Sequence, residues 1–308
     1  MARTRFAADR GLTNRMLTTM FLLGLVYVVF IAAMVAAGVQ WWLILLVVVG
    51  FFLFQFFGSE RMALYSMNAR VVSPEEAPAL HGVVDRLCAM ADMPKPKVAI
   101  AHSDMPNAFA TGHSRKKALV CVTTGLLRRL EPERDPAELE AVLAHELSHV
   151  AHRDVAVMTI ASTLGILAGF VSRFALQFAF VGGRGNNNNG GALLGLAVIL
   201  VSAIVYAVSF LLIRVLSRYR ELAADRGAAQ LTGRPSALAS ALTKISGEMG
   251  RIPTGDLRKA EPINAFFLVP AFAKRRGISL AQLFATHPPL EQRLEQLARI
   301  SADLGRGA

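Results

Sequence analysis

The chain has 308 residues, of which 54% are hydrophobic and only 18% are charged. This composition is too apolar for an ordinary soluble enzyme of this length, and it excludes a disordered or collagen-like chain. The net charge of +11 is compatible with nucleic-acid binding. However, several positive charges stand at the ends of long apolar runs, as in membrane proteins, and no arginine–aromatic pattern of a nucleic-acid module occurs. We therefore expect a membrane protein with no nucleic-acid partner.

Two apolar runs near the start of the chain, residues 16–38 and 41–57, are each long enough to cross a hydrocarbon core of about 30 Å. The connector between them is short and uncharged, so residues 1–57 are expected to form a transmembrane hairpin. Arginines precede the first run and follow the second. The positive-inside rule then predicts that both ends of this hairpin are cytoplasmic.

Residues 58–154 have a globular composition and are expected to form the first part of a cytoplasmic domain. A helix is predicted from Ser73 to Ala91, with Ser73 as its N-cap. Two short strands, an extended piece between them and a second long helix should follow. These elements are predicted at residues 97–102, 107–112 and 117–123, and from about residue 136.

Two more apolar runs, 155–182 and 192–213, predict a second transmembrane hairpin over residues 155–216. The segment between the runs is rich in Gly and Asn and is expected to be an external loop. Residues 217–308 should complete the cytoplasmic domain and be mostly helical. The predicted fold class is thus a multi-pass α-helical membrane protein with a mostly α cytoplasmic domain that carries a small β-sheet. The sequence leaves open whether the third and fourth runs cross fully or form a shallow hairpin.

The sequence from His145 to His149 reads HELSH, an HExxH motif. Residues i and i+4 lie on one face of a helix, so both imidazoles can bind one zinc ion. Glu146 stands beside the first histidine and can take a proton from the attacking water. The motif alone also fits two surface histidines near a membrane, so it needs support from other residues.

A catalytic zinc site needs a third protein ligand and one open position. Glu221 follows the fourth apolar run as closely as the HExxH helix precedes the third, which makes it the acidic residue best placed to complete a His–His–Glu site. Asp225 lies one helical turn later and can accept a hydrogen bond from the free N–H of a ligand histidine. In the alternative, both acids pair with Arg218 and Arg220 on a solvated face. The HExxH motif lies about as close in sequence to the third apolar run as Glu221 lies to the fourth, and this favours the metal site.

The HELSH motif, a long apolar hairpin and then SRYRELAAD together resemble the HtpX-type membrane zinc metalloproteases, which are related to the type I CAAX prenyl proteases. Two further segments add to the resemblance. NAFATG resembles the substrate-side strand of this family, and THPPLEQRLEQL resembles its C-terminal HPPxxxR segment. The resemblance covers nearly the whole chain and implies a zincin metalloprotease domain.

The resemblance also implies roles for individual residues. One zinc ion per chain would be bound by His145, His149 and Glu221. Glu146 would act as general base and then as proton donor to the leaving amine, and Asp225 would orient a ligand histidine. A strand edge would bind a substrate peptide through backbone hydrogen bonds. This edge consists of Asn107, Ala108, Phe109, Ala110 and Thr111.

Three further residues, His287, Arg293 and His152, have separate expected roles. His287 is expected near the cleft, where it would bind substrate or stabilise the oxyanion, although a helix cap is an equal alternative. Arg293 is expected to be structural. His152 departs from the family pattern and is expected to be a neutral substitution, with a competing metal ligand as the alternative.

The close sequence spacing between the ligands and the apolar runs predicts a zinc ion about 10 to 20 Å from the cytoplasmic interface. This position favours membrane proteins as substrates, with the lipid bilayer as the other partner. The resemblance implies a zinc metalloendopeptidase of the bacterial inner membrane, which removes misfolded or damaged membrane proteins in stress-linked quality control. The sequence does not determine the oligomeric state.

Other functions are compatible with parts of the pattern. A prenyl-protein peptidase of the CAAX type shares the motifs, but that branch is usually longer and has more spans. A non-enzymatic scaffold is disfavoured because every residue needed for hydrolysis is present. A transporter is disfavoured because the apolar runs hold few ionisable residues and no paired broken helices.

Overall fold

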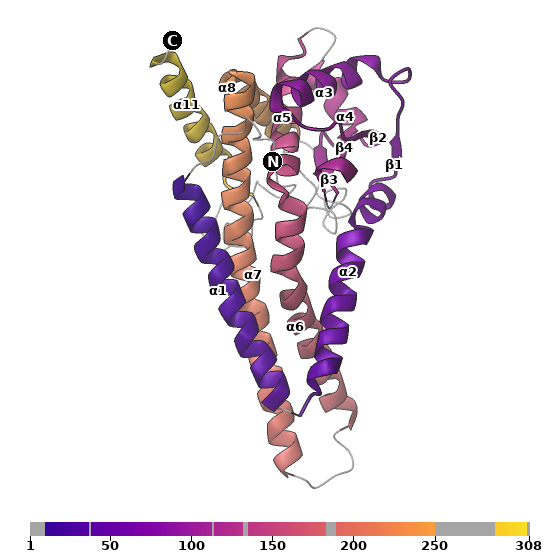
Figure 1. Ribbon diagram of the computed structural model, residues 1–308, viewed down its shortest axis with the longest axis vertical. Coiled ribbons are helices and arrows are strands. Elements are labelled where there is room, and N and C mark those ends of the chain that lie inside the picture. The colour runs from indigo at the N-terminus through magenta and orange to yellow at the C-terminus, as the bar shows by residue number, and fades with distance from the viewer. Residues whose placement is uncertain are drawn as a thin grey trace.

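Four long apolar helices form one end of the molecule, and a small sheet with shorter helices forms the other (Figure 1). This computed structural model describes residues 10–36, 38–112, 114–131, 135–182, 189–249 and 287–306. Most of the Gly/Asn-rich segment, for which an external loop is predicted, lies outside these residues, as does part of the predicted C-terminal helical region.

The four long helices are those that the apolar runs predict. They are α1 (Arg10–Ala36), α2 (Trp41–Ser66), α6 (Asp154–Gly182) and α7 (Asn189–Thr232). Each is long and apolar enough to cross a membrane. Their outward faces expose large apolar side chains such as Phe21, Trp41 and Leu200. A surface of this kind is stable against lipid but not against water.

The helix α7 is longer than the sequence pattern predicts. Its 44 residues measure about 66 Å at 1.5 Å per residue, roughly twice the thickness of the hydrocarbon core. The apolar pattern predicts a boundary near residue 216, but the helix continues through it. The reason is local, because no Gly or Pro interrupts the chain between Leu196 and Arg226. Glu221 and Asp225 therefore belong to the same rigid rod as the fourth span.

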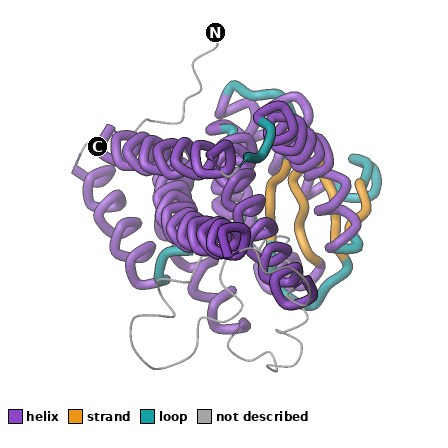
Figure 2. Tube along the Cα trace, turned by 90° about the horizontal axis from the view of Figure 1, so that it is seen from below, coloured by secondary structure: helices purple, strands orange, loops and turns teal. Residues whose placement is uncertain are grey.

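A four-stranded sheet supports the second end of the molecule (Figure 2). Its strands are β1 (Ala69–Val71), β2 (Lys97–Ala101), β3 (Ala108–Thr111) and β4 (Leu119–Thr123), in the order β1-β2-β4-β3. β2 and β4 are parallel, and the other two pairings are antiparallel. The strand β3 lies at an edge of this sheet. Its neighbour β4 is buried along its whole length.

The two faces of the sheet pack against different helices. One face contacts the end of α2, through a small cluster that includes Ala63, Met67 and Phe109. The other face contributes Val120 and Val122 to the main core. The shorter helices around that core are α3 (Pro78–Ala91), α4 (Thr124–Leu130), α5 (Ala137–His152), α8 (Pro235–Met249) and α11 (Leu290–Arg306), and the 3-10 turn η1 (Arg115–Lys117) precedes β4.

The prediction that the first short helix begins at Ser73 is wrong. The helix α3 begins at Pro78, where the missing N–H of proline costs no hydrogen bond. Residues 73–77 form turns instead, in which the Ser73 N–H donates to the carboxylate of Glu76 over 2.8 Å. The end of α3 at Ala91 agrees with the sequence analysis.

Candidate active site

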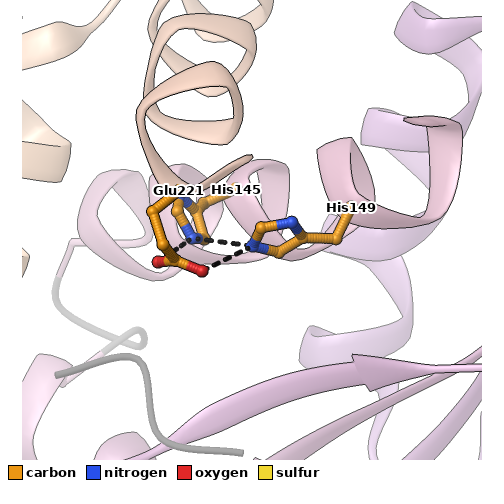
Figure 3. Close-up of side chains that lie close together, drawn as sticks. All are labelled: His145, His149 and Glu221. Atoms are coloured by element: carbon orange, nitrogen blue, oxygen red, sulfur yellow. Dashed lines mark hydrogen bonds and ion pairs between the residues drawn. The ribbon is translucent and has the colours of Figure 1, made fainter. Parts of the chain in front are cut away.

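The helix α5 supplies His145, Glu146 and His149, and it is buried along most of its length. It packs against α3, α7 and α8, which fixes the face that the two histidines share. The helix α7 crosses this face and adds Glu221 and, one turn later, Asp225. Residues more than 70 positions apart in the chain therefore meet in one cluster (Figure 3).

The geometry of the three predicted ligands is that of a metal site. The Nε2 atoms of His145 and His149 are 3.2 Å apart. The two carboxylate oxygens of Glu221 lie 3.6 Å from His145 Nε2 and 3.4 Å from His149 Nε2. A metal ion held tetrahedrally at about 2.0 to 2.1 Å keeps its ligand atoms about 3.3 to 3.4 Å apart. The three donors thus fit one ion without rearrangement.

A carboxylate oxygen lies close to the other nitrogen of each histidine ring. Asp225 Oδ1 lies 2.9 Å from His145 Nδ1, and Asp154 Oδ2 lies 2.5 Å from His149 Nδ1. An acceptor at Nδ1 favours the tautomer with its proton there, which leaves the Nε2 lone pair free to bind a metal ion. The sequence pattern predicts Asp225 in this position, but it does not predict Asp154.

Two arginines, one buried and one largely buried, compensate these carboxylates. Arg293 donates to Asp225 through Nε and Nη2, over 2.8 Å and 2.6 Å, and is 1% exposed. Arg220 Nη2 lies 2.9 Å from Asp154 Oδ2. The alternative in which Glu221 and Asp225 form a solvated face is wrong, because both are buried. The sequence gives one weak signal for the missed pair: Asp154 is an acid at the start of an apolar run, and Arg220 directly precedes Glu221.

The charges around the cluster favour a cation. Burial lowers the pKa of His149, but its hydrogen bonds to Asp154 and Glu221 outweigh burial and raise that pKa to about 10. The pKa of His145 is raised as well, because Asp225 and Glu221 outweigh the effect of burial. The surroundings of the two histidines therefore stabilise their protonated, positively charged forms. The same surroundings suit a metal ion, which binds the neutral imidazoles in place of the extra protons.

Glu146 lies beside the cluster and is 4% exposed. Burial raises the pKa of its carboxyl above the ordinary value, and the two histidines oppose this shift. A raised pKa improves a carboxylate as a proton acceptor. The Ala110 backbone also opposes the raised pKa of Glu146, and the helix α5 that carries Glu146 contacts the edge strand β3.

The segment predicted to bind substrate forms a strand at the sheet edge, next to α5. Ala108 to Thr111 form β3, and Asn107 precedes it, with its N–H donating to Thr123 Oγ1 over 2.8 Å. Among the described residues, β3 has no strand on its outer side.

His287 and His152 lie at different distances from the cluster. His287 Nδ1 is 3.0 Å from Glu221 Oε2, so this ring contacts the third predicted ligand. Two residues, Pro288 and Pro289, separate it from the start of α11. His152 Nδ1 lies 3.3 Å from Ser148 Oγ, and His152 is not among the three residues that converge.

Comparison with known proteins gives the same result as the geometry. Residues 74–301 match the model of peptidase family M48. Protease HtpX homolog 1 of Streptomyces coelicolor is 61% identical over 98% of this chain and 97% of its own length. Protease HtpX homologs of Methanosarcina mazei and Moorella thermoacetica are each 51% identical over 98% of this chain, and over 99% and 98% of their own lengths.

A solved structure shows a similar fold. The crystal structure of Ste24p from S. mikatae aligns with a TM-score of 0.50 at 17% identity, over 94% of this chain and 66% of that longer one. The predicted fold class is confirmed by this likeness and by the four apolar helices and small sheet. The chain belongs to peptidase family M48, and it is a multi-pass membrane metalloprotease of the kind that the HtpX resemblance predicts.

Proposed function

We propose that this protein is a zinc-dependent endopeptidase that cleaves misfolded or damaged membrane proteins at the cytoplasmic face of the bacterial inner membrane, as part of stress-linked quality control. The convergence of His145 Nε2, His149 Nε2 and the Glu221 carboxylate at tetrahedral spacing is the observation that carries the proposal. Two imidazoles and one carboxylate are the ligand set of a catalytic zinc.

The bound ion would supply Lewis-acid chemistry, polarising the scissile carbonyl and lowering the pKa of water. Glu146 would take the proton from the attacking water and then give it to the leaving amine. Asp225 would keep the His145 ring in the tautomer that presents Nε2. His287, whose Nε2 is buried and has no hydrogen-bond partner among the described residues, would donate to the substrate or to the oxyanion.

The edge strand β3 would bind the substrate as an added strand. Its outer side has no strand partner among the described residues, and β3 packs against α5, the helix that carries the base Glu146. A peptide bound along this edge would therefore run next to the base. Recognition through backbone hydrogen bonds depends little on side-chain identity, which suits an enzyme that removes diverse damaged proteins.

The position of the site supports membrane proteins as substrates. Asp154 begins the span helix α6 five residues after His149, and α7 carries Glu221 eight residues after Ile213. At 1.5 Å per residue, these ligands lie within about 12 Å of the apolar helical segments. Only protein segments that emerge near the bilayer reach such a site without unfolding over a long distance.

The first experiment compares the purified wild-type protein in detergent with Glu146→Gln, measuring zinc content and casein cleavage. Wild type should hold about one zinc per chain and cleave. The variant should keep its zinc and cleave at least about 100-fold more slowly, because the proton acceptor is gone. Wild type without zinc, or a variant that cleaves at the wild-type rate, contradicts the proposal. A prenylated C-terminal peptide in place of casein tests the CAAX-type alternative.

A further inference from the structure

The second histidine, His149, belongs to a buried unit with two residues that the proposed chemistry does not use. Its Nδ1 bonds Asp154 Oδ2 over 2.5 Å, and Arg220 Nη2 lies 2.9 Å from the same oxygen. The side chains of Asp154, Arg220 and His149 are 3%, 11% and 13% exposed. The unit is thus largely removed from solvent, and it includes His149, one of the three predicted metal ligands.

A backbone turn makes this contact possible. The helix α5 ends at His152, and Arg153 takes a left-handed conformation with φ of 58°. In an unbroken helix, residues three and four positions apart are neighbours, whereas a residue five positions on points away. The turn at Arg153 brings Asp154, the first residue of α6, back against the last turn of α5.

The pair also connects the two helices of the second apolar hairpin. Asp154 begins α6, and Arg220 stands on α7 directly before Glu221. One ion pair therefore joins α6 to α7, while its carboxylate holds the His149 ring. Any displacement of α6 against α7 would act on two of the three ligands at once.

The other histidine has a unit of the same chemistry but of different origin. Asp225 faces His145, and Arg293 binds Asp225 with two hydrogen bonds. Here the carboxylate stands on α7 and the arginine on α11, away from the hairpin turn. A histidine–aspartate–arginine arrangement thus occurs at both histidines, with α7 supplying the arginine in one case and the aspartate in the other, which indicates the same role for both arrangements.

We propose that Asp154, paired with Arg220, is a positioning residue for His149, and that through this pair the membrane hairpin sets the geometry of the metal site. The inference rests on the proposed zinc site. The Asp154 carboxylate holds the proton on Nδ1 and the ring in place, so that Nε2 faces the ion. Arg220 compensates a carboxylate that would otherwise be buried without a cationic partner.

The test measures zinc affinity by competition with a chromogenic chelator, on full-length protein in detergent, together with kcat and KM on labelled casein. Asp154→Asn keeps one acceptor oxygen and Asp154→Ala keeps none. We expect zinc affinity to fall in the order wild type, Asn, Ala, by about 10-fold to 100-fold for Ala. The kcat should fall, while KM for casein should change little. Arg220→Gln should lose more zinc affinity than Arg220→Lys, because lysine keeps a positive charge beside the Asp154 carboxylate.

The matched control weakens α6 without touching the site. The hydroxyl of Tyr27 donates to the backbone carbonyl of Ala161 in α6, so Tyr27→Phe removes one buried contact of this helix. We expect the control to melt at a lower temperature and to keep wild-type zinc affinity. If Asp154→Asn does not fold, the comparison of Arg220→Gln with Arg220→Lys takes its place.

Three outcomes overturn the inference. If the Asp154 variants bind zinc as tightly as wild type, Asp154 is not a positioning residue, and the proposed function is unaffected. Affinities that follow melting temperature across all variants, Tyr27→Phe included, show a purely structural role. A wild-type protein that binds no zinc overturns both proposals.

Discussion

His145 and His149 stand one turn apart on the same helix, and α7 contributes one residue to the pair beside each ring, but the other residue of each pair comes from a different helix. The Asp225–Arg293 pair beside His145 joins α7 to α11 and is almost inaccessible to solvent. The other pair, beside His149, joins the two helices of the apolar hairpin and is slightly more exposed. The His145 half of the site therefore depends on the packing of α11 against α7, and the His149 half depends on the contact between α6 and α7 within the hairpin. Variants that affect each half separately test this division.

The largest effect is expected from the residue that both halves share. Glu221→Ala removes the carboxylate that lies 3.6 Å and 3.4 Å from the two Nε2 atoms. Zinc affinity should fall by more than the roughly 100-fold that loss of an orienting partner costs, and casein cleavage should become undetectable. Glu295→Ala is the control, because its carboxylate is exposed and pairs only with Arg299 among the described residues. Equal zinc affinity in wild type and Glu221→Ala would exclude this glutamate as a ligand.

The next effect concerns stability on the His145 side. Arg293→Gln leaves Asp225 buried without its cationic partner, which should lower the free energy of unfolding by about 3 to 5 kcal/mol. Arg299→Gln on the same helix breaks an exposed pair and should change this free energy by at most about 0.5 kcal/mol. Denaturant unfolding in detergent measures both. An Arg293 variant that unfolds like Arg299→Gln would show that the buried pair contributes little to the fold.

The sequence predicts those features that depend on local pattern. Apolar length predicts the four long helices, and the i, i+4 spacing of HExxH predicts two imidazoles on one face of α5. Glu221 is predicted as a ligand from its short sequence distance to the fourth apolar run, and in the structure it lies close to both histidines. The edge strand β3 also lies where the extended NAFATG segment predicts it.

The features that the sequence does not predict depend on tertiary contacts. The partners of the two carboxylates come from positions far apart in the chain, and no local spacing relates Asp154 to Arg220 or Asp225 to Arg293. The start of α3 at Pro78 was missed because Ser73 and Pro74 also form a plausible helix start, and Glu76 holds them in turns instead. A serine before proline therefore does not by itself fix the first turn.

The smallest expected effect concerns Arg153, whose backbone turn brings Asp154 to His149. With φ of 58°, this position suits glycine, and its side chain is exposed. Arg153→Gly should keep wild-type zinc affinity and change the free energy of unfolding by less than about 1 kcal/mol, since relief of backbone strain offsets the added entropy of the unfolded chain. Arg153→Val places a β-branched residue in the left-handed region, should cost about 1 to 2 kcal/mol, and should weaken zinc binding as well. If Arg153→Gly loses zinc affinity and Arg153→Val does not, the arginine side chain and not the turn supports the His149 half of the site.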